Sequence, residues 1–157
     1  QPKYNLINVQ GDGNCFYRAL YHAITSNQTI KAHPDLASLN ENQFVEKIRK
    51  DAAAAAARDS AYFSKPIKSL YDESLTEKNT QEIINTIETD GKWDGKAGDA
   101  AVSIVQQYMK NTYDIEVDIF LPGQTDPHHR IGNVPCLFCS GDHYQVMVPT
   151  PPPVKLS

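Results

Sequence analysis

The pattern of apolar and polar positions predicts a strand, a tight turn and a helix at the start of the chain. Residues 4–9 are expected to form a short strand, and a glycine-rich turn follows at residues 11–13. Residues 15–25 then carry apolar side chains at the three- and four-residue spacing of one buried helix face. These side chains are Phe16, Leu20, Ala23 and Ile24.

The middle of the chain is predicted to be helical. A helix begins after Asn40, because Gln43 three residues later completes a capping-box pattern, and it continues through six consecutive alanines. Further helices are predicted over residues 76–89 and 99–111, with Asp99 as the N-terminal cap of the second.

The last third of the chain has the period of strands. Apolar and acidic residues alternate over residues 115–121, which predicts a half-buried strand. Residues 133–140 and 143–149 are predicted to form a hairpin around the Gly141-Asp142 turn. One strand and several helices followed by three strands indicate an α+β fold, with a small mixed or antiparallel sheet flanked by helices.

Length and composition fit one globular domain. The chain has 157 residues, of which 40% are apolar, and we expect a monomeric domain over residues 1–149 with a proline-rich tail or linker start at 150–157. No apolar run approaches the roughly 18 residues that span a membrane. The net charge of −4 comes without a basic stripe, which argues against a nucleic acid partner.

Cys15 is the candidate nucleophile. Three cysteines, an odd number, argue against a disulfide framework and predict a reducing intracellular compartment, in the first place the cytoplasm. Cys15 lies in the first turn of a helix, where unpaired N–H groups and the helix dipole favour a thiolate. Gly11 and Gly13 on either side of Asp12 let several N–H groups converge, as an oxyanion hole requires. A buried structural cysteine is the alternative. A dinucleotide-binding turn is excluded because Phe16 replaces its third glycine.

His143 is the candidate base among five histidines. It begins an apolar strand directly after a turn, a position that fixes the ring and leaves it at the mouth of a cleft. His22 lies two helical turns beyond Cys15, which is too far for it to act as the base. Polar loops, where solvated rings are expected, hold the others: His33, His128 and His129.

Four segments carry a resemblance to a known family. Residues 12–19 (DGNCFYRA) resemble the nucleophile motif of the ovarian-tumour (OTU) cysteine proteases, and residues 141–144 (GDHY) are similar to the histidine motif of that family. Residues 93–95 (WDG) and the strand over 114–120 resemble further segments in the family's order, so the resemblance spans residues 6–148. The cysteine motif is the most specific of the four.

The resemblance implies a papain-like OTU fold and a deubiquitinase. Such an enzyme hydrolyses the isopeptide bond after the C-terminal glycine of ubiquitin through a thioester, without a metal or other cofactor. Carried over to this chain, Cys15 is the nucleophile and His143 the general base. Asp12 and Gly13, with the N–H of Cys15, line the oxyanion hole, and Asn14 braces that loop. The implied partners are ubiquitin or polyubiquitin chains and other ubiquitin-like modifiers, in the host cytoplasm if the source is a virus or a bacterial effector.

The chain departs from the family at one position. The family often has Asp or Asn two residues after the histidine, where this chain has Gln145. Gln145 shares a strand face with His143 and is the candidate orienting residue, with Asn5 as the alternative. Trp93 and Tyr144 are candidate substrate contacts.

Two other readings stay open. Cys136 and Cys139 form a C-x₂-C pair near His143, which is arithmetically sufficient for a zinc site with an upstream histidine. Against a zinc site, the two cysteines would face opposite sides of a strand. A redox C-x-x-C motif is also disfavoured, because such a motif is expected at the start of a helix. A non-catalytic OTU-like module that binds ubiquitin is the second alternative, favoured by Gln145.

Overall fold

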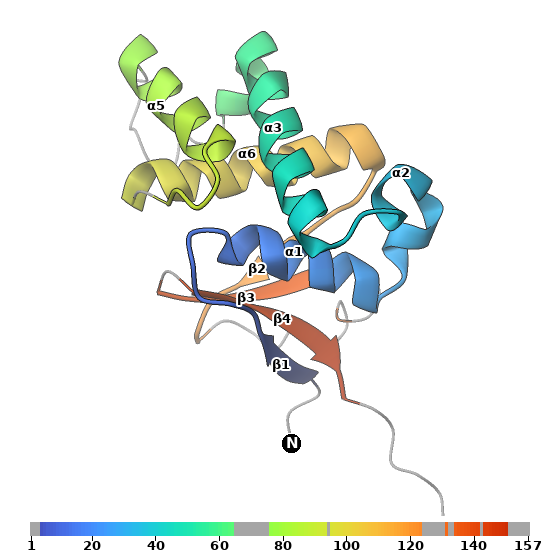
Figure 1. Cartoon of the computed structure of the whole chain (residues 1–157). Coiled ribbons are helices and arrows are strands. Elements are labelled where there is room, and N and C mark those ends of the chain that lie inside the picture. The colour runs from blue at the N-terminus through green and yellow to red at the C-terminus, as the bar shows by residue number, and fades with distance from the viewer. Residues whose placement is uncertain are drawn as a thin grey trace, which may run out of the picture.

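A four-stranded sheet carries one helix on its face, and the other helices stack beyond that helix (Figure 1). The computed structural model describes residues 4–64, 76–93, 95–123, 131, 134–141 and 143–150. The strands are β1 (Tyr4–Asn8), β2 (Asp118–Phe120), β3 (Cys136–Ser140) and β4 (His143–Pro149), in the order β1-β4-β3-β2. Only the β2–β3 pair is parallel. The sheet is mixed, as the sequence predicts.

The helices of the described residues lie on one side of the sheet. They are α1 (Cys15–Ser26), α2 (Pro34–Ala37), α3 (Glu41–Arg58), α5 (Glu77–Glu88) and α6 (Gly95–Tyr113), with 3-10 turns at Thr29–Ala32 and Ser60–Phe63. Helix α1 separates the sheet from α3, α5 and α6 (Figure 1). None of these helices is long and apolar enough to cross a membrane.

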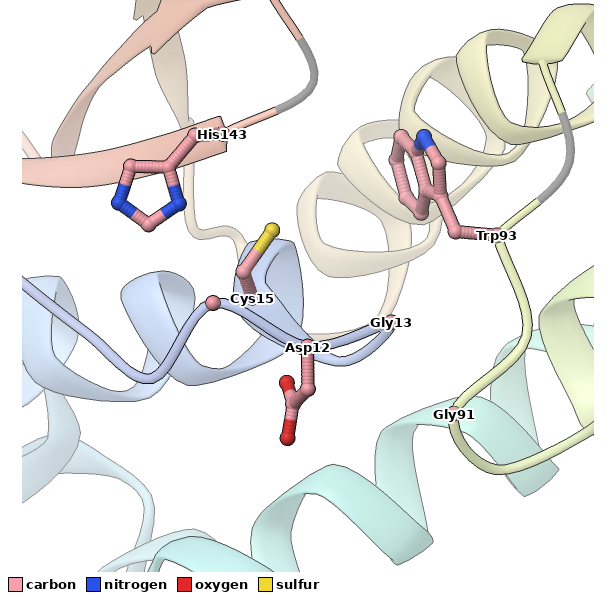
Figure 2. Close-up of a pocket in the computed structure, with 7 residues that line it drawn as sticks. Asp12, Gly13, Cys15, Gly91, Trp93 and His143 are labelled. Carbon is pink, nitrogen blue, oxygen red and sulfur yellow. The ribbon is translucent and has the colours of Figure 1, made fainter.

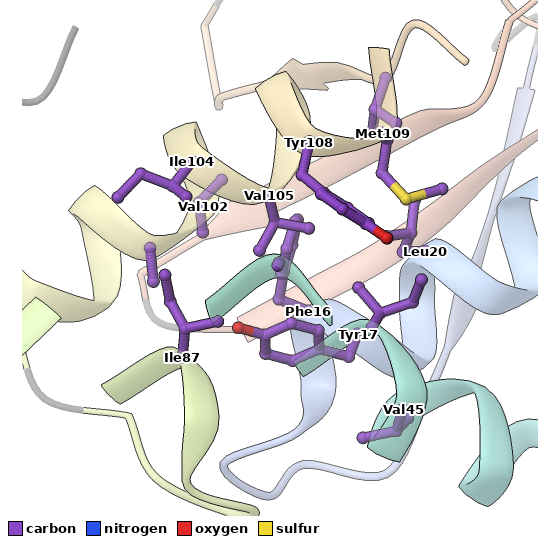
Figure 3. Close-up of a cluster of buried hydrophobic side chains, with 14 of the residues drawn as sticks. Phe16, Tyr17, Leu20, Val45, Ile87, Val102, Ile104, Val105, Tyr108 and Met109 are labelled. Carbon is purple, nitrogen blue, oxygen red and sulfur yellow. The ribbon is translucent and has the colours of Figure 1, made fainter. Parts of the chain in front are cut away.

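The main core fills the space around α1. Phe16, Tyr17 and Leu20 of α1 are fully buried and meet apolar side chains from α3, α5 and α6 (Figure 3). Burying each such side chain stabilises the fold by about 1.5–3 kcal/mol relative to leaving it in water. A smaller cluster of Ile131, Cys136 and Met147 forms a second, separate part of the core. The packing fixes α1 against β4, and these two elements supply the candidate nucleophile and base.

Local signals place most element boundaries correctly. Asn40 and Gln43 form the predicted capping box, with the Gln43 N–H donating to Asn40 Oδ1 at 2.9 Å and the Asn40 N–H donating to Gln43 Oε1 at 3.0 Å. The β3–β4 hairpin is confirmed by the pairing of Ser140 with His143. Its turn residue Asp142 and the proline-rich residues 151–157 lie outside the described residues, so the domain boundary stays a prediction.

Three predicted boundaries are wrong. The strand predicted over 133–140 begins at Cys136, because Val134 forms only an isolated bridge with Ile131. Helix α6 begins at Gly95, one turn before Asp99, because Ala97 and Gly98 are already buried and Gly98 packs against Trp93. The strand predicted over 115–121 is confined to Asp118–Phe120.

The start of that segment belongs to the end of α6. Asp114 adopts φ 54°, and the Ile115 N–H donates to the Met109 carbonyl at 3.2 Å. Ile115 and Val117 are therefore buried without being paired in the strand.

Candidate active site

Seven residues line a cleft of about 530 Å³ at the N-terminal end of α1 (Figure 2). They are Gly11, Asp12, Gly13, Cys15, Gly91, Trp93 and His143. The sulfur atom of Cys15 points into the space between the His143 ring and Trp93 (Figure 2). The two residues that sequence reasoning selects for chemistry, 128 positions apart, thus meet in one cleft.

The fold brings Cys15 and His143 together because α1 packs directly on β4. Cys15 is the first residue of α1, and His143 is the first residue of β4. Cys15 is 5% exposed, whereas His143 is half-buried at the edge of the sheet.

The thiol of Cys15 is less acidic than its place at a helix start suggests. Burial raises the pKa of the Cys15 thiol and outweighs the backbone N–H groups of Tyr144 and Phe16, which lower it. The negative charge of Asp12 raises this pKa further. The expectation of a readily formed thiolate is therefore wrong for this state, and the thiol needs a base to take its proton.

The turn before Cys15 offers one unengaged amide donor. The Asp12 N–H donates to the Gln10 carbonyl at 3.0 Å, and the Cys15 N–H donates to the Asp12 carbonyl at 3.1 Å. Within the described residues, the Gly13 N–H donates to no other group. Of the three predicted oxyanion donors, Gly13 alone is free to bind an incoming oxygen in this state.

The side chain of Asp12 points away from Cys15 (Figure 2). Its Oδ1 accepts the Asn14 N–H at 3.0 Å, and its Oδ2 forms an ion pair with Arg18 at 3.1 Å. An Asp that accepts the N–H two residues later stabilises a turn. Asp12 therefore shapes the loop that lines the cleft through the bonds of its carboxylate.

Asn14 fastens this loop to a distant segment. Its buried Oδ1 accepts the Gly91 N–H at 3.0 Å, and its Nδ2 donates to Asp90 at 3.2 Å. The same Oδ1 accepts from Arg49 Nε at 2.8 Å. Sequence reasoning assigns Asn14 a bracing role, and these bonds identify the segment it braces against.

Gln145 lies beside Asn8 rather than Asn5. Gln145 Nε2 donates to Asn8 Oδ1 at 2.7 Å, and the two residues are paired across β4 and β1. Asn5 pairs with Val148, on the opposite face of the sheet from His143 by strand alternation. The polar pair Asn8–Gln145 is thus on the His143 face, and Asn5 is not.

Of the two candidate substrate contacts, Trp93 lines the cleft and Tyr144 does not. Tyr144 is 5% exposed because it points to the face of β4 opposite His143, where its ring lies 5.2 Å from that of Phe16. Its contribution comes from the backbone, through the N–H that favours the Cys15 thiolate. That contribution depends on tertiary contact and has no signal in the sequence.

Cys136 and Cys139 do not converge on a site. Cys136 belongs to the smaller core cluster and Cys139 to the main one, so their side chains lie on opposite faces of β3. Among the described residues, no group of three or more His, Cys, Asp or Glu side chains is arranged to hold a metal ion. His128 and His129 lie outside these residues.

Sequence reasoning missed Arg49, Asp90 and Gly91, which support the cleft. Arg49 is 1% exposed on the apolar face of α3, four residues after the buried Val45 and four before the buried Ala53. A cation at that spacing on a buried face was the available signal. Asp90 and Gly91 have no such pattern, because only the fold brings their loop to the cysteine.

Comparison with known proteins identifies the fold. No family model matches the sequence, and no curated protein matches it. The viral OTU domain protease from Taggert virus aligns with a TM-score of 0.57 at 13% identity, over 93% of this chain and 80% of that one. The corresponding protease from Farallon virus gives 0.53 at 14% identity, over 94% and 85%. That from Dera Ghazi Khan virus gives 0.52 at 12% identity, over 94% and 82%. The chain has the α+β fold of the OTU domain proteases, as the resemblance predicts.

Proposed function

We propose that this chain is a deubiquitinase, a cysteine protease that cleaves the isopeptide bond after the C-terminal glycine of ubiquitin. The observation that carries the proposal is the cleft shared by Cys15 and His143 in an OTU fold. The viral neighbours are OTU domain proteases by name. The proposal extends that activity class to this chain on the strength of its own thiol and imidazole.

The geometry supports the following reaction. His143 takes the proton of the buried Cys15 thiol, and the thiolate attacks the carbonyl carbon of the terminal glycine. The Gly13 N–H stabilises the resulting oxyanion. As the carbon–nitrogen bond breaks, His143 returns the proton to the leaving lysine amine. Water then hydrolyses the thioester with His143 again acting as the base.

The walls of the cleft favour a glycine tail. Gly11, Gly13 and Gly91 contribute backbone without side chains, and Trp93 adds one flat aromatic surface. An extended segment without side chains can approach such backbone closely, whereas a bulky residue at the same place would collide. The C-terminal glycines of ubiquitin meet this requirement. The net charge of −4 is compatible with the arginine-rich segment that precedes them.

A non-catalytic ubiquitin-binding module is the second candidate. Two observations favour it: Gln145 stands where the family often has Asp or Asn, and burial raises the pKa of the Cys15 thiol. The enzyme is the better-supported proposal because a binding module does not require a thiol and an imidazole in one cleft. In either case we propose that the protein acts as a monomer in a reducing cytoplasm.

Incubation with a panel of di-ubiquitins of every linkage tests the proposal. We expect wild-type protein to release mono-ubiquitin from at least one linkage, and Cys15→Ala to release none while retaining the wild-type melting temperature. The uncleaved di-ubiquitin should still bind Cys15→Ala. Binding by wild-type protein without cleavage would instead support the binding module.

A further inference from the structure

Among the described residues, Arg49 heads the largest side chains that the fold buries completely. It lies in the middle of α3 with 1% of its surface exposed, and burial lowers the pKa of its guanidinium. Its hydrogen bonds to the described residues go to five backbone carbonyls and one side-chain amide, and none of them to a carboxylate. Burying such a charge is costly unless its N–H donors are all hydrogen-bonded. The groups that accept from Arg49 therefore indicate its role.

Every nitrogen of the guanidinium has an acceptor. Nη1 donates to three carbonyls at the end of α5 and just beyond it, those of Thr86, Ile87 and Thr89, at 2.9 to 3.1 Å. Nη2 donates to the Gly13 carbonyl at 2.6 Å and the Lys92 carbonyl at 3.3 Å, and Nε donates to Asn14. Carbonyls at a helix C-terminus carry partial negative charge and so offset the cation.

The acceptors outside α5 belong to the two segments that meet at the cleft. Gly13 and Asn14 form the turn that leads into Cys15, whereas Thr89 and Lys92 flank the loop that carries Gly91 to the opposite wall. The two segments are about 76 residues apart in sequence, as the Asn14–Asp90 bond records. One planar cation therefore fixes the spacing of both walls.

The bond to Gly13 restrains a particular peptide unit. The carbonyl of Gly13 and the N–H of Asn14 belong to the same peptide plane. Arg49 holds the carbonyl, and Asp12 Oδ1 holds the N–H at 3.0 Å. With both ends held, that plane cannot rotate freely. The preceding plane, which carries the Gly13 N–H, is held in turn by its Asp12 carbonyl, which accepts the Cys15 N–H at 3.1 Å.

Only arginine fits this position. Its planar group presents five N–H donors in fixed directions, whereas the lysine ammonium has three on a single nitrogen. The guanidinium carbon also lies 4.1 Å from the ring centre of Tyr17, where the flat cation stacks on the aromatic face. A lysine here would keep the charge and lose the simultaneous contacts to both walls.

We propose that Arg49 is a positioning residue for the acyl-transfer step. It acts by holding the Gly13 N–H in the orientation that stabilises the oxyanion, and by setting that amide against the Gly91 wall. The catalytic part of this inference rests on the proposed function. The restraint of the Gly13–Asn14 peptide by Arg49 can be measured whether or not the protein is a protease.

The variant Arg49→Lys tests this role against Arg58→Lys, an exposed arginine in the last turn of the same helix. With a fluorogenic amide of ubiquitin, we expect kcat of Arg49→Lys to fall at least about tenfold with KM within about twofold of wild type. Alkylation of Cys15 by iodoacetamide needs no oxyanion donor and should stay within about twofold. Arg58→Lys should match wild type in kcat, in KM and in the rate of Cys15 alkylation.

An unchanged kcat in folded Arg49→Lys would overturn the proposal. So would an equal loss of alkylation and turnover, because that result indicates a general disturbance of the cysteine. A merely structural role for Arg49 also predicts a lower kcat. A lower kcat with an unchanged rate of Cys15 alkylation is specific to positioning.

A second measurement separates this inference from the proposed function and does not need Arg49→Lys to fold. In wild-type protein, the Nε–H of Arg49 should exchange with solvent at least about tenfold more slowly than that of Arg58, because it is buried and bonded to Asn14. Equal exchange rates would overturn the restraint even in an active enzyme. Slow exchange in a protein that cleaves no ubiquitin substrate would retain the restraint and reject the function.

Discussion

The backbone of Gly13 lies directly against the carbonyl of Gly91. A Cβ atom at residue 13 would stand 1.8 Å from the Gly91 oxygen and 2.4 Å from its carbonyl carbon. No side-chain rotation relieves such a collision, because both atoms belong to backbone. Glycine at position 13 is therefore required by the contact between the two walls of the cleft.

Gly13→Ala should destabilise the fold and abolish activity. Forcing a methyl group into a well-packed site costs about 1–3 kcal/mol, and here the backbone itself must move. Urea unfolding measures the change in the free energy of unfolding. Gly11→Ala is the matched control for stability, since its Cβ would meet only the His143 ring at 3.9 Å. Equal stability of the two variants would contradict the close contact.

Asp12→Asn should make the Cys15 thiol more acidic. The Asp12 carboxylate raises the pKa of Cys15, so removing its charge lowers that pKa and increases the thiolate fraction at a given pH. The amide oxygen of Asn can still accept the Asn14 N–H, which preserves the turn. The midpoint of the pH profile for iodoacetamide alkylation should move to lower pH.

Glu41→Gln provides the control for this shift. Glu41 pairs with the same Arg18 at 2.7 Å but is not among the charges that act on Cys15. Its alkylation profile should coincide with that of wild type. A profile of Asp12→Asn that moves to higher pH would show that the carboxylate acts mainly through loop geometry.

Gln145→Asp should give activity equal to or higher than wild type. A carboxylate on the His143 face of β4 would stabilise the imidazolium that forms during the reaction, as the amide cannot. Gln145→Ala should lower kcat by about ten- to hundredfold, since a misplaced base reacts slowly.

Wild-type activity in Gln145→Ala would mean that another residue orients His143. Asn8→Ala distinguishes the two explanations. Gln145 Nε2 donates to Asn8, so Asn8→Ala should also lower kcat if Gln145 orients His143. The double variant should then lose little more activity than either single variant.

Tyr17→Phe should leave the protein as stable as wild type or more stable by about 1 kcal/mol. Within the part of the chain that the structure describes, the buried Tyr17 hydroxyl has no hydrogen-bond partner, which costs about 1–3 kcal/mol. Tyr62→Phe is the control, because the Tyr62 hydroxyl accepts from Asn111 and its loss should not stabilise. A large destabilisation by Tyr17→Phe would indicate that the hydroxyl is bonded in solution.

Tyr17 also predicts a pH dependence. Burial raises the pKa of Tyr17 to about 12 from the ordinary value of 10.0. An acid whose folded pKa is raised contributes stability that is fully present below the unfolded pKa and is lost as pH rises toward the folded value. Wild type should therefore lose more stability between about pH 10 and pH 12 than Tyr17→Phe does. Parallel losses in this range would contradict the shift.

Local patterns predict much of the fold, and tertiary contacts decide the rest. The capping box at Asn40 and the β3–β4 hairpin depend on neighbours within a few residues, so the sequence predicts them correctly. The local pattern at Asp99 is that of a helix cap, but burial of Gly98 starts the helix earlier. The local pattern at Ile115 is that of a strand, but this residue is bonded to the end of α6.

The site divides in the same way. Cys15 and His143 stand in motifs that a reader of the sequence can find. The role of Arg49 has no local signal beyond its apolar surroundings, because its carbonyl acceptors lie 36 to 43 residues away. The raised pKa of Cys15 likewise follows from burial by the packed α1–β4 contact. The candidate nucleophile and base can be predicted from local motifs. The hydrogen bonds that position them and the pKa of the thiol depend on the assembled fold.

The most direct test of the account is reaction with ubiquitin that carries an electrophile at its C-terminus. Intact-mass measurement should show wild-type protein gaining the mass of one ubiquitin, and neither Cys15→Ala nor His143→Ala gaining it. Cys136→Ala, which changes a thiol outside the cleft, should react as wild type does. Absence of the adduct on folded wild-type protein, or its persistence in Cys15→Ala, would contradict the proposed ubiquitin protease.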